Sequence, residues 1–118
     1  MAEKKTYTGG CHCGEVRFEV TADISNVMAC NCSLCQKRGA LWVFVTPDCF
    51  ALRAGSDDLK DYQFGKKTIH HLFCPQCGVG AFSRGASSQG EMIAVNVRCL
   101  DDVDLAGLKV TPFDGKSL

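Results

Sequence analysis

Nine cysteines in a chain of 118 residues are the feature that most limits what this sequence can fold into. A disulfide framework is disfavoured, because the number is odd and because cysteines one residue apart, such as Cys11 and Cys13, are poorly placed to bridge without strain. We also expect the chain to be cytosolic, and the cytosol keeps thiols reduced. We therefore expect metal binding to explain most of the cysteines, which stand at positions 11, 13, 30, 32, 35, 49, 74, 77 and 99.

Seven of the cysteines fall into three short segments, each of which predicts a chelating turn. The segments read Cys-His-Cys-Gly from Cys11, Cys-Asn-Cys-Ser-Leu-Cys from Cys30, and Cys-Pro-Gln-Cys-Gly from Cys74. Zinc prefers thiolate ligands in a tetrahedron, and such short spacing lets one turn present two sulfurs to the same ion. The glycines that end two of the segments, Gly14 and Gly78, permit the positive φ that such a turn often needs.

Two of these segments predict a structural zinc site. A structural site is closed by four protein ligands, commonly two from each of two separated turns, because this arrangement links distant parts of the chain. We call the predicted ligands the four-thiol group: Cys11, Cys13, Cys74 and Cys77.

The remaining segment predicts a second zinc site of a different kind. We call Cys30, Cys32 and Cys35 the three-thiol group, since the sequence offers no obvious fourth partner. Three protein ligands and an open position are typical of catalytic zinc, which can ionise a thiol or polarise a carbonyl. The alternative is a second structural site completed by Cys99, Cys49 or a histidine.

The other cysteines and the histidines are weaker signals. Cys49 is most simply a small buried apolar residue, whereas Cys99 lies either in the core or near the three-thiol group. His12 is expected to point to solvent. His70 and His71 are adjacent in a predicted strand and therefore point to opposite faces, and His71 is the better candidate for a pocket.

Three basic residues are candidates for substrate binding. Lys37 and Arg38 follow the three-thiol group directly, and Arg98 precedes Cys99. Although most surface cations are merely solvated, cations beside an open metal can neutralise a carboxylate-bearing ligand.

Length and charge restrict the class of protein. The chain has 13 basic and 13 acidic residues, so no overall field draws it to nucleic acid or to a membrane surface. The beginning of the sequence lacks the apolar segment of a secretory signal, and no apolar run approaches the roughly 18 residues of a membrane span. We expect a cytoplasmic protein that folds as one zinc-binding domain over residues 1–118, with no nucleic-acid or membrane partner.

Short strands dominate the predicted secondary structure. Alternating Val16, Phe18 and Val20 predict a strand at residues 15–22, and helix is expected only for a turn or two at 36–39 and near 101–107. Residues 84–91 are small and polar, which predicts a hairpin loop. The fold class is therefore mainly β with little helix, and further strands are predicted at residues 41–47, 49–55, 59–65, 68–73, 81–85 and 91–100.

Together these segments resemble a known family. "GGCHCGEVRFEV", "CNCSLCQKRGALWVF", "HLFCPQCGVGAF" and "NVRCLD" are similar to the glutathione-dependent formaldehyde-activating enzymes, a family that also includes the centromere protein V proteins. The resemblance covers about residues 8–102. It implies a β-tent-like fold of several small antiparallel sheets held by zinc, with the four-thiol group as structural ligands and the three-thiol group as catalytic ligands.

The resemblance also implies an activity. The family's namesake reaction joins glutathione and formaldehyde reversibly into S-hydroxymethylglutathione, which is carbon–sulfur lyase chemistry. We therefore expect a zinc-dependent enzyme acting on a small thiol such as glutathione. The alternative is a non-catalytic zinc module that binds a protein or serves as a scaffold, and it would show a second ion closed by four ligands and an exposed apolar patch.

Overall fold

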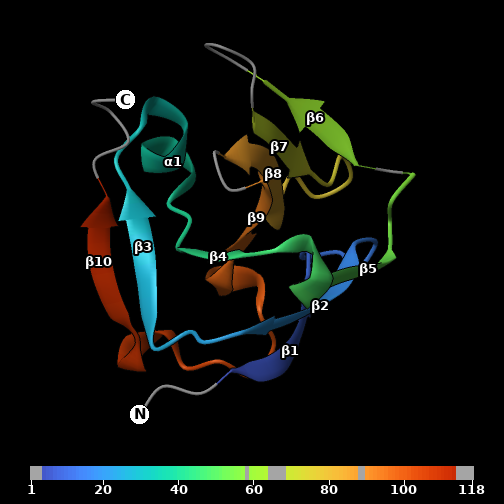
Figure 1. Ribbon diagram of the computed structural model, residues 1–118. Coiled ribbons are helices and arrows are strands. Elements are labelled where there is room, and N and C mark those ends of the chain that lie inside the picture. Colours follow the sequence, from blue (N-terminus) through green and yellow to red (C-terminus); the bar gives the residue numbers. More distant parts are fainter. Residues whose placement is uncertain (1–3, 58, 64–68, 88–89, 114–118) are drawn as a thin grey trace.

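The computed structural model describes residues 4–57, 59–63, 69–87 and 90–113 (Figure 1). Ten strands account for most of these residues, with one short α-helix and three turns of 3-10 helix. In chain order the elements are β1 (Lys5–Gly10), β2 (Arg17–Ala22), β3 (Asn26–Cys30), α1 (Ser33–Arg38), β4 (Trp42–Val45), η1 (Pro47–Cys49), β5 (Phe50–Ala54), β6 (Lys60–Tyr62), β7 (Ile69–Phe73), β8 (Phe82–Ser87), β9 (Gly90–Asn96), η2 (Val97–Cys99), η3 (Leu105–Gly107) and β10 (Lys109–Phe113).

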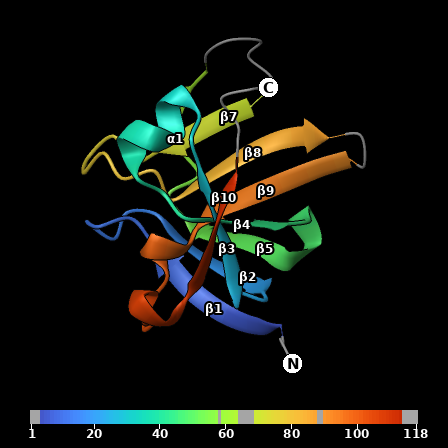
Figure 2. The same ribbon diagram turned by 90° about the vertical axis from the view of Figure 1, so that its left-hand side faces the viewer.

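The strands form two sheets. The smaller sheet has the order β1-β2-β5, and the larger sheet has the order β10-β3-β4-β9-β8-β7-β6. All pairings are antiparallel except that of β3 with β10, which lie side by side and parallel (Figure 1). Figure 2 shows β7, β8 and β9 running together, with β1 and β2 below them.

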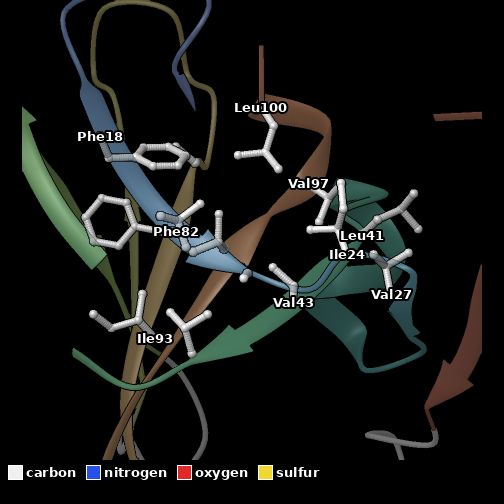
Figure 3. Close-up of a cluster of buried hydrophobic side chains, with 14 of the residues drawn as sticks. Phe18, Ile24, Val27, Leu41, Val43, Phe82, Ile93, Val97 and Leu100 are labelled. Atoms are coloured by element: carbon white, nitrogen blue, oxygen red, sulfur yellow. The ribbon is translucent and has the colours of Figure 1, made fainter. Parts of the chain in front are cut away.

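The main core lies between the sheets. Alternate residues of β2, Phe18 and Val20, are buried in the same cluster as Phe82 and Ile93 of the larger sheet. Figure 3 shows Phe18, Phe82 and Ile93 in this cluster. Rings of Phe18 and Phe82 approach that of Phe50 to centroid distances of 5.3 and 4.7 Å, which is a favourable spacing for aromatic contact. The period-two burial of β2 is the pattern that its sequence predicts.

A second, smaller cluster lies apart from the main core. Cys35, Ala40 and Trp42 are its buried members, with Cys30 and Cys32 packed against them. The three-thiol group therefore belongs to a hydrophobic cluster of its own, next to helix α1.

The mainly β prediction is confirmed, and three strands are additions to it. β1, β3 and β10 were not predicted, because none shows a clear apolar alternation and β10 contains Pro112. Pro112 is tolerated because β10 is an edge strand. The predicted strands at 59–65 and 68–73 are confirmed as β6 and β7, although residues 64–65 and 68 lie outside the described part of the chain.

Helix is as scarce as the sequence predicts. The turn predicted at 36–39 is the end of α1, which stops at Gly39 in the left-handed conformation, and the turn near 101–107 contains η3. Residues 84–91, predicted as a hairpin loop, belong largely to the strands of the hairpin. Strand β8 extends to Ser87, and β9 begins at Gly90. Within the described ranges, no helix has the length and apolar character needed to cross a membrane.

Candidate metal centre

The structure brings the sulfurs of the four-thiol group together from two loops. Cys11 and Cys13 lie in the loop between β1 and β2, and Cys74 and Cys77 lie in the loop between β7 and β8, on the same side of the molecule (Figure 2). The four Sγ atoms lie within 4.8 Å of one another. Since the loops belong to different sheets, this group connects the smaller sheet to the larger one.

The spacing of these sulfurs fits a zinc ion. Sγ of Cys13 lies 3.6 Å from Sγ of Cys11 and 3.6 Å from Sγ of Cys74. Four Zn–S bonds of about 2.3 Å directed to the corners of a tetrahedron place sulfurs about 3.8 Å apart. A disulfide would need about 2.05 Å, and the structure describes all nine cysteines as free thiols.

Both loops turn in the same way. The N–H of Cys11 donates to the carbonyl of Val16 at 3.1 Å, and the N–H of Cys74 donates to the carbonyl of Val79 at 3.1 Å. As the sequence predicts, the glycines adopt positive φ, at 86° for Gly14 and 80° for Gly78. A residue with a Cβ would be strained at either position.

Backbone N–H groups favour the thiolate form in the four-thiol group. The N–H of Val16 lies 3.3 Å from Sγ of Cys11. The N–H groups of Val79 and Cys13 lower the pKa of the Cys77 thiol to about 6. Hydrogen bonds of this kind orient and stabilise metal-binding sulfurs.

The three-thiol group lies where β3 ends and α1 begins. Cys30 is the last residue of β3, Cys32 caps the helix by accepting from the N–H of Cys35, and the three Sγ atoms lie within 4.8 Å of one another. The indole Nε1–H of Trp42 donates to Sγ of Cys35 at 3.3 Å. Burial raises the pKa of Cys35 to about 12, so a cation that binds there at neutral pH must displace a proton.

No other described residue joins either group of thiols. Cys99 packs against the main core, and burial raises its pKa to about 11, with the charges of Cys11 and Cys77 acting in the same direction. Of the two places considered for Cys99, the core is therefore the one observed. Cys49 is partly buried against the same core, next to the hydroxyl of Thr46.

A cavity of about 460 Å³ opens beside the three-thiol group. It lies on the face of the larger sheet opposite the main core, because its β4 and β9 residues, Trp42, Phe44, Met92 and Ala94, alternate with core residues. The cavity is lined by Met28, Cys30, Cys32, Cys35, Trp42, Phe44, Ile69, His71, Ser83, Arg84, Gly85, Ala86, Met92, Ala94 and Phe113.

The histidines lie as the sequence predicts. His71 is 7% exposed and lines the cavity, whereas His70 points to the other face, where its Nδ1 lies 2.6 Å from Oδ2 of Asp61. Nδ1 of His71 lies 3.4 Å from the hydroxyl of Ser83. Burial lowers the pKa of His71, and the charge of Arg38 lowers it further, so the ring is neutral at pH 7. His12 is exposed.

The three basic residues chosen from the sequence are not among the described residues that line this cavity. Lys37 is exposed, the Arg38 guanidinium lies 5.9 Å from the ring centroid of Phe73, and Nε of Arg98 donates to the carbonyl of Gly39 at 3.0 Å. Arg84 is the one basic residue among the described residues that line the cavity. The strand pairing turns its side chain to the other face of the sheet, because Arg84 pairs with Ile93 of the main core and with His70.

Comparison with known proteins agrees with the geometry. Residues 6–113 match the family model described as glutathione-dependent formaldehyde-activating enzyme. A crystal structure of a Rhodobacter sphaeroides protein is similar, with a TM-score of 0.77 and 31% identity over 88% of this chain and 99% of that one. The matched residues cover nearly the whole chain and include both groups of cysteines. The chain therefore belongs to the family of glutathione-dependent formaldehyde-activating enzymes.

Proposed function

We propose that this protein is a zinc-dependent carbon–sulfur lyase that joins a small thiol reversibly to formaldehyde or a similar aldehyde. One observation carries the proposal: the three-thiol group lies in the wall of a cavity large enough for a small substrate. The family match supports the same chemistry, because its description names both glutathione and formaldehyde.

The two cysteine groups have separate roles in this proposal. The four-thiol group would hold a structural zinc, since its four sulfurs lie within 4.8 Å of one another, as the ligands of one tetrahedral ion do, and connect the two sheets. The three-thiol group would hold a second zinc, and among the described residues no fourth side-chain ligand closes it. A zinc ion there would supply a positive charge that keeps a substrate thiol ionised at neutral pH.

The reaction needs a proton to be moved. In the forward direction a carbon–sulfur bond forms, the carbonyl π bond breaks, and the proton lost by the thiol ends on the new hydroxyl. His71 has a neutral ring at pH 7, lines the cavity and lies next to the Ser83 hydroxyl, so these side chains can hold that proton during the exchange. The apolar walls limit the water that competes for the aldehyde.

The alternative, a non-catalytic binding module, depends on exposed apolar side chains. Phe44 and Ile69 are 47% and 45% exposed. Both belong to the lining of the cavity that contains the three-thiol group. A catalytic pocket therefore accounts for these side chains together with three thiols, whereas the zinc module would need a fourth ligand, which the described residues do not supply.

Nuclear magnetic resonance exchange spectroscopy tests the proposal. The zinc-loaded protein is mixed with formaldehyde and with glutathione or phenylmethanethiol in separate samples. With at least one of the two thiols we expect faster exchange between the free thiol and its S-hydroxymethyl adduct than in buffer. Cys32→Ser should reduce the protein-dependent rate at least about tenfold, because it removes one ligand of the three-thiol group. Cys49→Ser, which lies outside both groups, is the matched control and should keep the rate. Exchange no faster than in buffer with both thiols would refute the proposed activity.

A further inference from the structure

The residues that form the cavity follow from the register of the larger sheet. Phe44 pairs with Ala94, Ala94 with Ser83, and Ser83 with His71, so these four side chains form one row across β4, β9, β8 and β7. A neighbouring row consists of Met92, Gly85 and Ile69. Small residues, Ala94 and Gly85, occupy the middle of both rows, and larger ones stand at the ends. The pairing of the strands therefore determines where the cavity is deep, because it brings the small residues together.

The walls of the cavity are apolar. Six large side chains surround the space next to the thiols: Met28, Trp42, Phe44, Ile69, Met92 and Phe113. Five large hydrophobic residues among those described are exposed, and three of them (Phe44, Ile69 and Phe113) lie here. Water contact with such side chains is unfavourable, and an apolar ligand would remove it.

The cavity offers little to a charged ligand. Among the described residues that line it, Arg84 is the one Lys, Arg, Asp or Glu, and its side chain lies on the other face of the sheet, where its Nε is 3.1 Å from Oε1 of Glu91. Glutathione carries two carboxylates and one ammonium group. Placing these groups against apolar walls without partners is unfavourable, because each unsatisfied polar group loses its hydration and a charged group loses still more.

We propose that the thiol substrate of this protein has an apolar, uncharged body, and that it is not glutathione. This inference rests on the proposed function, which places the substrate sulfur at the three-thiol end of the cavity. The apolar body then lies against Phe44, Ile69 and Met92.

Trp42 provides a direct measurement of binding. It is the only tryptophan in the chain, it lines the cavity, and its Nε1–H donates to Cys35. We would titrate zinc-loaded protein with phenylmethanethiol and with glutathione, follow Trp42 fluorescence, correct for quenching with free tryptophan, and check the bound zinc afterwards. We expect phenylmethanethiol to bind with a Kd at least about tenfold lower than that of glutathione.

Truncation of two side chains that are almost equally exposed locates the binding site. Ile69 and Val110 are 45% and 44% exposed, but only Ile69 lines the cavity. We expect Ile69→Ala to raise the Kd of phenylmethanethiol several-fold and Val110→Ala to leave it unchanged. Ala94→Leu fills the middle of the row and should abolish binding, and the unfolding transition of this variant shows whether it is folded.

The two proposals fail in different ways. Glutathione that binds as tightly as phenylmethanethiol, no saturable binding of phenylmethanethiol, or an Ile69→Ala effect no larger than that of Val110→Ala would overturn the apolar substrate. The exchange experiment above decides the reaction separately. Tight apolar binding without faster exchange would support the pocket's preference and overturn the lyase activity.

Discussion

At the residue scale, two side chains distinguish the three-thiol group from the four-thiol group. Trp42 donates to Cys35, and His71 lies in the same cavity without belonging to either set of thiols. Backbone N–H groups donate to sulfur in both groups, from Val16 to Cys11 in one and from Cys35 to Cys32 in the other. A side-chain donor to sulfur and a histidine in an adjoining cavity are therefore what set the three-thiol group apart among the described residues.

The burial of His71 predicts a specific dependence of stability on pH. Burial and the charge of Arg38 lower its pKa below 6.5, against the opposing charge of Asp61, with His70 acting in the same direction as Arg38. As pH falls through 6.5, the unfolded chain therefore takes up a proton before the folded chain does. The free energy of unfolding should fall by up to about 1.4 kcal/mol per pH unit from this residue.

Denaturant unfolding of zinc-loaded protein between pH 7 and pH 5 measures the effect. His71→Gln cannot take up the proton and should show a shallower loss of stability than the wild-type protein. Protonation of the zinc-binding thiols affects both proteins equally, so the difference between the curves isolates His71. Parallel curves would mean that His71 is not buried in its neutral form.

At the scale of elements, each group of thiols depends on a different kind of connection. The four-thiol group joins the β1–β2 loop to the β7–β8 loop, and so it joins two sheets. The three-thiol group joins the end of β3 to the first turn of α1, which follow each other in the chain. Loss of a ligand from the four-thiol group would separate loops that are distant in the sequence. Loss of a ligand from the three-thiol group would affect only β3 and α1, which are adjacent in the chain.

Serine substitutions in the two groups should therefore differ. Cys74 is completely buried, so Cys74→Ser removes a ligand and leaves a hydroxyl in the core, which should cost about 3 kcal/mol or more and can prevent folding. Cys32→Ser keeps an N-cap for α1, because serine is among the best residues there, and should leave a folded protein. Thermal melts measure both, with Cys49→Ser as the control, and the reverse ranking would contradict the assigned roles.

At the scale of the whole molecule, the two groups of thiols lie in different surroundings. The main core lies between the sheets and is closed at one side by the four-thiol group, while the cavity occupies the opposite face of the larger sheet. An ion held by the three-thiol group could leave the cavity without disturbing the main core. An ion held by the four-thiol group would free, on leaving, the two loops that connect the sheets.

We therefore expect two zinc ions per chain that leave at different rates. A chelator should remove the ion of the three-thiol group first, with the circular dichroism spectrum unchanged, and loss of the second ion should coincide with unfolding. Zinc release followed with a coloured indicator, alongside circular dichroism, measures both events. Release of both ions at one rate, or loss of all zinc from a protein that stays folded, would contradict this division.

Much of this protein follows from the sequence alone. The spacing of the cysteines predicted both groups of thiols, because a chelating turn is local and depends on residues two or three apart. Positive φ at Gly14 and Gly78 and the short helix ending at Gly39 were predictable for the same reason. The alternation of β2 identified a strand with one buried face.

Other features depended on the tertiary structure. The edge strands β1 and β10 lack a readable pattern because most of their side chains are exposed or half-buried, and β10 pairs with β3, which lies near the other end of the chain. The cavity depends on strand register, since a shift of one residue would turn Phe44 and Ala94 towards the main core. For the same reason Lys37, Arg38 and Arg98 were expected at a pocket that they do not line. A chelating turn depends on residues that are close together in the sequence, but register and packing between distant strands decide which side chains share a cavity.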